Sequence, residues 1–203
     1  NNLDLEKILS SIRLRKTHNN IMRSGIGVGG YCLTKDPLFA KASSQQILQK
    51  KFDFPLSSKA VEVNKKMTFD VMSEIRDKFN KKIFGKKVLL IGVSYREDTN
   101  DTRYSPAEGV FDFFKKMKCK TSFYDPIVNY WDFTDSYSIE KKNLNNFDVY
   151  VYLIKHQSFK KLNISYKKKS LILDLNHVLE NNERSKISNN KNFESYFIGS
   201  QQQ

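Results

Sequence analysis

One cysteine of this chain lies among residues that could make it a nucleophile. Cys32 follows the glycine-rich run Gly27–Tyr31 and precedes Lys35–Pro37. A free thiol has a pKa of about 8.5 and reacts as the thiolate, so a nucleophilic cysteine needs an electropositive setting. Lys35, the N–H groups of the glycine-rich run and the start of a following helix could supply that setting. The residue types therefore allow covalent catalysis at Cys32.

A structural explanation competes with each of these roles. A small apolar cysteine beside glycines is usually a packing residue, and Lys35 could be a solvated surface cation. Asp36 before Pro37 is a suitable N-cap followed by a first-turn proline. The other cysteine, Cys119, lies in an apolar alternation and is expected in the core. Two cysteines without a CxxC pair favour a reducing compartment, and three scattered histidines predict no metal site.

The glycines at positions 25, 27 and 30 also fit the letters GxGxxG. A dinucleotide-binding fingerprint must follow a strand and open a helix. The preceding residues 15–23 do not have a strand pattern, so this loop is not expected to bind a dinucleotide in that way. Its glycines can still let backbone N–H groups approach a ligand closely.

The first part of the chain has helical periodicity. Apolar residues form one stripe over 3–14, a second helix is expected to begin at Asp36–Pro37, and a longer one covers about 58–79. The long helix bears Val63, Met67, Val71 and Ile75, four residues apart. A partner helix could cover this stripe, and packing within one chain is an equal possibility.

The pattern changes near residue 84. Short apolar runs at 87–92, 120–124, 148–153 and 170–174 predict buried parallel strands, and Ser105–Pro106 predicts the start of a helix. Strands that alternate with helices predict an α/β domain with a Rossmann-like, doubly wound parallel sheet. We therefore expect an all-helical segment at 1–84 and an α/β domain at 85–203.

Composition narrows the classes of function. The 39% of hydrophobic residues can form a core, and no apolar run is long enough to cross a membrane. A net charge of +13 favours anionic partners. A basic nucleic-acid binder is one alternative, but the lysines are dispersed and no recognition motif is present. No signal peptide is evident, and the first residue is Asn1. We expect a cytoplasmic piece of a longer protein, without membrane or nucleic-acid partners.

Two segments resemble one known family. Gly27–Pro37 resembles the active-site segment of the UDP-glucose/GDP-mannose dehydrogenase family. Gly92–Pro106 resembles the UDP-binding domain of that family, and Tyr124–Pro126 resembles its next strand end. The resemblance covers about residues 3–180. It implies the C-terminal portion of such an enzyme, with the end of the central dimerisation helices before residue 85 and the UDP-binding domain after it.

The resemblance implies an NAD-dependent oxidation of a UDP-sugar alcohol to a carboxylate. In this chemistry Cys32 is the nucleophile and passes through a thioester, while Asp36 assists with water or a proton and Lys35 supplies charge. NAD is bound mainly by an N-terminal domain that is absent from this chain, as are other catalytic groups of the family. The chain alone is therefore not expected to turn over.

The resemblance also assigns binding residues by position. Arg23 and the loop 24–29 correspond to a segment that grips the substrate, while Tyr95 and Arg96 correspond to an aromatic and basic pair that contacts the UDP-sugar. Arg103 corresponds to an arginine that reaches toward NAD. For each arginine, a surface salt bridge is the alternative. The loop residues concerned are Ser24, Gly25, Gly27 and Gly29.

The substrate implied is UDP-glucose or a UDP-N-acetylhexosamine, with a weak preference for the latter, and the product would serve polysaccharide biosynthesis. Many relatives carry an arginine where this chain has Asn176, which puts one substrate contact in question. A homodimer through the central helices is expected. The alternative is a non-catalytic module that binds nucleotide-sugars or pairs with a partner.

Overall fold

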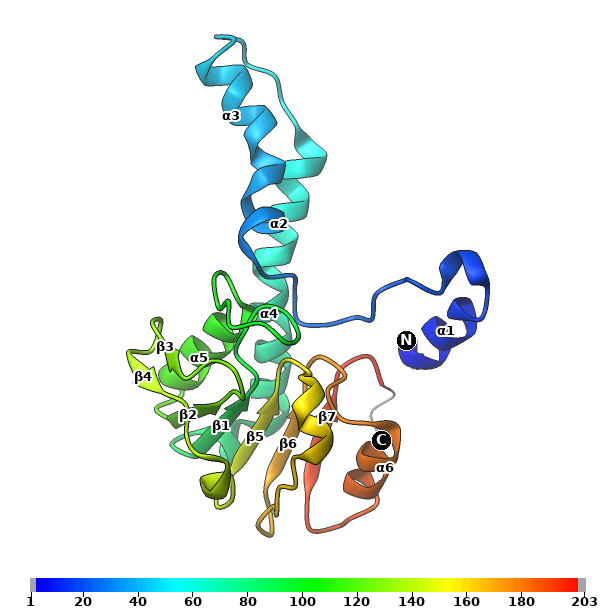
Figure 1. The fold of residues 1–203 in the computed structure, drawn as a ribbon, viewed down its shortest axis with the longest axis vertical. Coiled ribbons are helices and arrows are strands. Elements are labelled where there is room, and N and C mark those ends of the chain that lie inside the picture. Colours follow the sequence, from blue (N-terminus) through cyan, green and yellow to red (C-terminus); the bar gives the residue numbers. More distant parts are fainter. Residues whose placement is uncertain (1–2, 201–203) are drawn as a thin grey trace.

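A helical part precedes an α/β domain in the computed structural model, which describes residues 3–200 (Figure 1). Figure 1 shows α2, α3 and most of α4 as an arm that projects from the sheet, while α1 lies to one side at the end of an extended segment. The helices and 3₁₀ turns of this part are α1 (Leu5–Arg13), η1 (Lys16–His18), α2 (Tyr31–Lys35), η2 (Asp36–Leu38), α3 (Phe39–Gln46) and α4 (Pro55–Ile83).

The long helix α4 joins the arm to the sheet. It begins at Pro55, slightly before the predicted start, because proline at the first helical position loses no hydrogen bond. Residue Phe79 departs from helical geometry and kinks the last turn. The apolar stripe divides between two environments: Val63 and Met67 are 47% and 37% exposed, whereas Ile75 is fully buried. Only the C-terminal half of α4 therefore packs into the core of its own chain.

The α/β domain is built on a parallel sheet. Its five strands have the order β2-β1-β5-β6-β7, so the direction of winding reverses between β1 and β5. This is the doubly wound sheet expected from the sequence. A two-stranded antiparallel ribbon, β3 with β4, follows β2. The strands are β1 (Lys87–Ile91), β2 (Lys120–Tyr124), β3 (Tyr130–Trp131), β4 (Ser136–Tyr137), β5 (Val149–Tyr152), β6 (Leu171–Asp174) and β7 (Glu194–Phe197).

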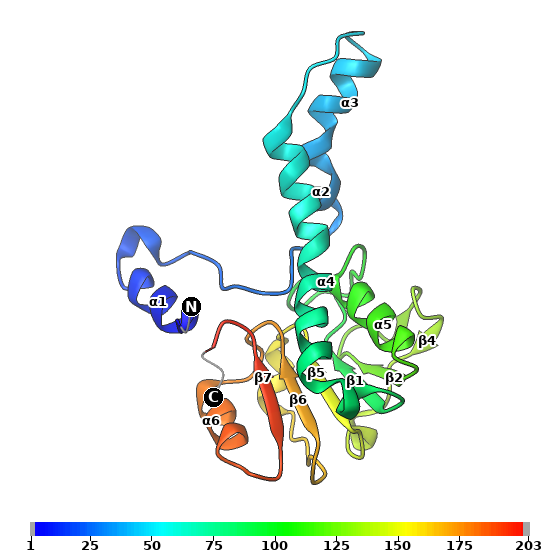
Figure 2. The same cartoon turned by 180° about the vertical axis from the view of Figure 1, so that it is seen from behind.

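Helices cover both faces of the sheet. α4 and α5 (Pro106–Lys116) pack on one face, as Figure 2 shows from behind, and the side chains of Val88 and Leu90 point into that layer. The turns η3 (Lys141–Asn143) and η4 (Gln157–Lys161) lie between strands, and α6 (Asn181–Ser188) packs on the opposite face against Ile172. Each central strand therefore buries both of its faces, which explains its continuous apolar sequence.

The four predicted strands are confirmed to within one residue. The edge strand β7 was not predicted because its sequence, Glu-Ser-Tyr-Phe, is short and half polar. Ser105 caps α5 as expected, since its hydroxyl accepts a hydrogen bond from the Ala107 amide at 3.2 Å. Within residues 3–200, no helix combines the length and apolar composition that crossing a bilayer requires.

Candidate functional site

The glycine-rich loop 23–30 crosses the edge of the sheet where the parallel strands end. At one end of the loop, the Ser24 hydroxyl is 3.2 Å from Nε2 of His177, beyond β6. Gly25 packs on the side chain of Asn176, and a β-carbon at Gly25 would lie 2.1 Å from the amide oxygen. A glycine is therefore required here by close approach. Ligands of open α/β sheets bind outside this edge, near the point where the strand order reverses.

The other end of the loop packs against the segment that follows β1. A β-carbon at Gly29 would lie 2.7 Å from the carbonyl oxygen of Tyr104. Gly30 has a φ of +89°, and a β-carbon there would lie 2.7 Å from the ring of Tyr95. These glycines bring the backbone directly before Cys32 into contact with the candidate nucleotide-binding loop 92–105.

Helix α4 holds the middle of the loop. The side-chain amide of Asn64 donates to the Val28 carbonyl at 2.7 Å, and its oxygen accepts from the Val28 amide at 2.8 Å. The Thr68 hydroxyl donates to the Ile26 carbonyl at 2.8 Å. Neither residue was singled out from the sequence, because polar residues on a helix usually face solvent. The hydrogen bonds fix the loop between the arm and the sheet.

We expect Gly30→Ala to lower the free energy of unfolding by about 2 kcal/mol, because a side chain there meets both an unfavourable φ and the Tyr95 ring. Gly85→Ala is the matched control: Gly85 also has a positive φ, of +71°, but a β-carbon there meets nothing within 4 Å. Urea unfolding of both variants measures the difference. Equal losses would show that the contact with Tyr95 contributes nothing.

Cys32 is exposed and lies in the first turn of α2. The Lys35 ammonium is 2.8 Å from the Asp36 carboxylate and 4.0 Å from the centroid of the Tyr31 ring. The hydrogen bond to Asp36 raises the pKa of Lys35, and a thiolate at Cys32 acts in the same direction. Lys35 therefore stays protonated at neutral pH and places a cation near the thiol.

Asp36 does not have the capping role that its position before Pro37 suggested. A helical element does begin at Asp36–Pro37 as expected, since the 3₁₀ turn η2 starts there and leads into α3, but no side chain caps its N-terminus. The short helix α2 before it was not predicted. Its carboxylate pairs with Lys35 instead and is 42% exposed. The pair leaves Asp36 open to a ligand or to water.

Arg103 lies on the same side of the molecule as Cys32. Its guanidinium donates to the Asp101 carboxylate from Nε, at 3.0 and 3.1 Å to the two oxygens, and from Nη2 at 2.6 Å. It lies 5.3 Å from the Tyr31 ring centroid. The hydrogen bond from Arg103 lowers the pKa of Asp101. Tyr104 completes this surface cluster at 5.9 Å from Tyr31, measured between ring centroids. A salt bridge therefore does hold Arg103, on an exposed surface.

Tyr95 and Arg96 occupy the loop that follows β1. The Tyr95 amide donates to the Asp101 carbonyl at 2.9 Å, and its ring is partly covered by Gly30. Arg96 is exposed, and its carbonyl accepts a hydrogen bond from the Ser94 hydroxyl at 2.8 Å. The structure thus brings Tyr95 and the loop before Cys32 together, with Arg96 next to them.

Arg23 lies at the opposite end of the glycine loop. Its Nε is 3.7 Å from the Glu6 carboxylate, and the other oxygen of Glu6 is 3.5 Å from Nδ1 of His177. The Leu5 amide donates to the Gly199 carbonyl at 2.9 Å, which attaches α1 beside β7. Neither Glu6 nor His177 was predicted as a site residue, because their contact joins distant segments. The predicted binding residues therefore line both ends of one loop rather than a single cluster.

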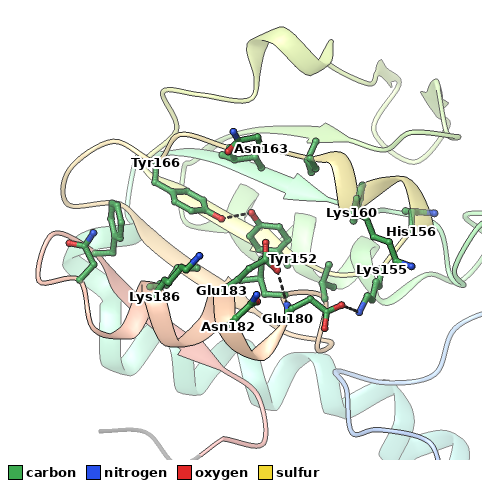
Figure 3. A pocket seen from close by; sticks show the side chains of 18 residues that line it. Tyr152, Lys155, His156, Lys160, Asn163, Tyr166, Glu180, Asn182, Glu183 and Lys186 are labelled. Carbon is green, nitrogen blue, oxygen red and sulfur yellow. Dashed lines mark hydrogen bonds and ion pairs between the residues drawn. The ribbon is translucent and has the colours of Figure 1, made fainter.

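A separate cavity of about 590 Å³ lies between η4 and α6 (Figure 3). Its main polar groups satisfy one another: Lys155 pairs with Glu180 at 2.6 Å, and the hydroxyls of Tyr152 and Tyr166 are 2.6 Å apart. None of the residues predicted for binding or catalysis lines it. Among residues 3–200, no group of three or more His, Cys, Asp or Glu side chains could hold a metal ion.

Two family models match the chain in order. The central domain of the UDP-glucose/GDP-mannose dehydrogenase family matches residues 1–66, and the UDP-binding domain of the same family matches residues 89–181. Together they include the cysteine loop, the segment after β1 and most of the sheet. The matches therefore cover both ends of the candidate site.

Individual relatives agree with these matches. The UDP-N-acetyl-D-mannosamine dehydrogenase of Methanococcus aeolicus is 30% identical over 177 residues, which are 86% of this chain and 37% of that protein. The UDP-glucose 6-dehydrogenase of Rickettsia prowazekii is 26% identical over 196 residues, or 90% of this chain and 43% of that protein. The chain thus spans about two fifths of the length of these curated relatives.

A solved structure has the same fold. The crystal structure of the NDP-N-acetyl-D-galactosaminuronic acid dehydrogenase from Methanosarcina mazei superposes with a TM-score of 0.72 at 23% identity. The alignment covers 98% of this chain and 44% of that one. Both the helical part and the α/β domain therefore have counterparts in that structure.

Proposed function

The chain belongs to the UDP-glucose/GDP-mannose dehydrogenase family, and we propose that it forms the end of the central domain (1–84) and the UDP-binding domain (85–203) of an NAD-dependent UDP-sugar 6-dehydrogenase. Residues 1–2 and 201–203 of these ranges lie outside the described residues. The observation that supports the proposal is the contact between the glycine loop before Cys32 and the segment after β1. Under this proposal, the contact would bring the candidate nucleophile Cys32 close to the nucleotide.

The UDP moiety would bind at the end of β1, next to Gly30. Tyr95 offers a ring face for the uracil base, and Arg96 is an exposed cation that can pair with the diphosphate. Arg23, at the other end of the loop, would contribute a second cation. The loop between them would present its N–H groups to the ligand, because its glycines leave the backbone uncovered.

Cys32 would carry the covalent chemistry. Its thiolate adds to the carbonyl carbon of the sugar aldehyde and holds it as a thiohemiacetal, so the aldehyde does not escape. Loss of a hydride from the thiohemiacetal converts it into a thioester on the same sulfur, and water hydrolyses this thioester to the carboxylate. Lys35 keeps a positive charge near the sulfur, and Asp36 is placed to orient the water or take its proton.

Only one residue of this chain is proposed to contact the cofactor NAD. NAD would accept the hydrides. The residue proposed to contact it is Arg103, whose side chain is 64% exposed and paired with Asp101. That arrangement suits a cation aimed outward at a phosphate. The rest of the cofactor site would come from a domain outside this chain.

The sugar is proposed to be an N-acetylhexosamine, with glucose as the second candidate. The relatives include UDP-N-acetyl-D-mannosamine dehydrogenases and UDP-glucose 6-dehydrogenases. Asn176, which stands where many relatives carry an arginine, lies against the backbone of Gly25. It therefore acts as a packing residue under the loop, and the charge of the missing arginine is not replaced at that point.

The arm is proposed to form a homodimer. Leu33, Phe39, Leu56, Val63 and Phe69 are each at least 47% exposed. So much exposed apolar surface along one projecting hairpin is typical of a protein interface. Sedimentation equilibrium tests the proposal, and the mass of a single chain at all accessible concentrations would contradict it.

Calorimetric titration of the chain tests the function. We expect saturable binding of UDP and of its UDP-sugar, and no comparable affinity for NAD, because the main cofactor site lies elsewhere. Arg96→Ala should weaken UDP binding about tenfold or more, since it removes a charge-assisted contact. Lys160→Ala, in the separate cavity, is the control and should change nothing.

The salt dependence of binding and the turnover of the full-length protein distinguish the remaining alternatives. Binding to duplex DNA that falls steeply with salt, with no UDP binding, would favour a nucleic-acid binder. UDP binding together with a complete lack of turnover in the full-length protein would favour the non-catalytic module. A folded chain that binds no UDP contradicts the proposed function.

A further inference from the structure

A buried aspartate and a buried histidine meet beneath the loop that carries Tyr95 and Arg96. Nε2 of His156 lies 3.2 Å from Oδ2 of Asp125, and both side chains are 0% exposed. Asp125 follows β2, and His156 follows β5, so the pair spans the point where the sheet reverses its winding. The loop 92–105 follows β1, the strand between β2 and β5. Asp125 lies in the segment Tyr124–Pro126 noted in the sequence, but neither residue was predicted to have a role at the site.

Asp125 holds the start of this loop. Its Oδ2 accepts a hydrogen bond from the Val93 amide at 2.8 Å and a longer one from the Ser94 amide at 3.4 Å. Burial alone would raise the pKa of Asp125, but the hydrogen bonds from His156 and from backbone amides outweigh it and lower the pKa. The group therefore stays an ionised acceptor at neutral pH.

His156 holds the same loop further along. Its Nδ1 accepts a hydrogen bond from the Asp98 amide at 3.1 Å, and Oδ1 of Asp98 in turn accepts from the Gln157 amide at 3.0 Å. Asp98 has a φ of 52°, a left-handed conformation that aspartate adopts more readily than most residues but that local hydrogen bonds must still constrain. The bond to His156 is one source of that constraint.

The two hydrogen bonds favour one tautomer of the His156 ring. Nδ1 must be unprotonated to accept from the Asp98 amide, and Nε2 must carry the proton to donate to the Asp125 carboxylate. The ring is packed edge-to-face on Phe159, with centroids 5.2 Å apart, and so does not rotate freely. Figure 3 shows His156 at the η4 end of the neighbouring cavity, behind Lys155 and Lys160.

We propose that His156 and Asp125 are positioning residues that fix the loop 92–105 so that Tyr95 and Arg96 meet the UDP-sugar. This inference rests on the proposed function. Asp125 holds the backbone immediately before Tyr95, and His156 holds it shortly after Arg96. Both residues are buried, so they act on the ligand only through the loop. Without them the loop populates other conformations. The apparent affinity for UDP is then reduced in proportion to the fraction of molecules whose loop has the binding conformation.

Three substitutions separate positioning from simple loss of stability. His156→Ala removes the hydrogen bonds with Asp98 and Asp125 and also the 3.4 Å contact between Nε2 and the Ser94 hydroxyl. His156→Asn places an amide oxygen near the position of Nδ1 and keeps the bond from Asp98, whereas His156→Gln places an amide nitrogen near Nε2 and keeps the bond to Asp125. His18→Ala is the control, because His18 is a half-buried histidine of η1, remote from this loop, that contacts Thr17. UDP affinity is measured by calorimetry on the whole chain, and the melting temperature is measured for each variant.

We expect His156→Ala to weaken UDP binding at least about tenfold, which corresponds to a loop that has its binding conformation in about one molecule out of ten. His156→Asn should restore most of the affinity and His156→Gln little of it, although both amides lower the melting temperature. Affinities that follow the melting temperatures across the three variants would show a merely structural role and overturn the proposal.

The unsubstituted chain provides a test that does not depend on any variant folding. Nitrogen NMR of the His156 ring should show a protonated Nε2 and an unprotonated Nδ1 at neutral pH, and the opposite tautomer would overturn the proposal. The two proposals fail in different ways. Absence of UDP binding by the unsubstituted chain contradicts the proposed function and this inference with it. UDP binding that His156→Ala leaves unchanged contradicts this inference alone.

Discussion

Replacing Cys32 with serine is expected to reduce turnover by a factor on the order of 10³ or more, because a serine hydroxyl is far less nucleophilic than a thiolate and its ester is hydrolysed differently. Turnover can be measured only with the rest of a dehydrogenase, which corresponds to the part of the relatives that this chain does not match. A chimaera with that part of the Methanococcus aeolicus dehydrogenase supplies it, and NADH absorbance reports the rate. UDP affinity should stay unchanged.

Cys119→Ser is the matched control for this substitution. Cys119 is partly buried, and its thiol donates to the Ile83 carbonyl at 3.0 Å. A hydroxyl can make the same hydrogen bond, so this variant should keep nearly full turnover.

If Cys32→Ser retained the rate of the unsubstituted chimaera, the covalent route through Cys32 would be wrong. In the chain alone, iodoacetamide should label Cys32 well before Cys119, and bound UDP-sugar should slow the labelling of Cys32.

Asp174→Ala is expected to lower the free energy of unfolding by about 3–5 kcal/mol. The Asp174 carboxylate is fully buried and accepts two hydrogen bonds from Arg184, of 3.0 Å from Nε and 2.7 Å from Nη2. It also accepts the Val178 and Leu179 amides, each at 2.9 Å. The Asn176 amide donates to the same carboxylate at 3.3 Å, so alanine would leave a buried guanidinium and three backbone amides without their acceptor.

Urea unfolding of this variant, with Glu62→Ala as the control, measures the effect. Glu62 pairs with Lys59 at 2.8 Å, but both side chains are about two-thirds exposed, so the control should change stability by less than about 0.5 kcal/mol. A loss at Asp174 as small as that at Glu62 would show that solvent reaches Arg184 and satisfies it.

The fold was largely predictable because its strands are buried on both faces. Such strands give continuous apolar runs, as in Lys87–Ile91, whereas the edge strand β7 gives no comparable signal. The start of α2 was not predictable, because it depends on Gly30 adopting a φ of +89° against the Tyr95 ring. Asp36 and Pro37 correctly indicated the start of η2, which leads into α3, but nothing local indicated the short helix α2 before them.

The candidate site was predictable only in part. Cys32, Tyr95 and Arg96 were found from local segments that resemble a family, and the structure places their segments in contact. His156 and Asp125 lie 31 residues apart in the sequence. Asp125 belongs to the segment Tyr124–Pro126, but nothing local connects it with His156, so only the folded sheet reveals their pairing. Polar pairs that span strands are invisible to periodicity, because each member looks like an ordinary strand-end residue.

The helix α4 also limits how the gene can vary in length. Thr68 binds the glycine loop, and Met72, one turn later, is buried against the sheet. Each residue of an α-helix advances the direction of its side chains by about 100°. A single codon gained or lost between these two positions would turn the loop contacts away from the sheet contacts. The connection 47–54 at the tip of the arm lacks this phase relation, so insertions and deletions should accumulate there during evolution.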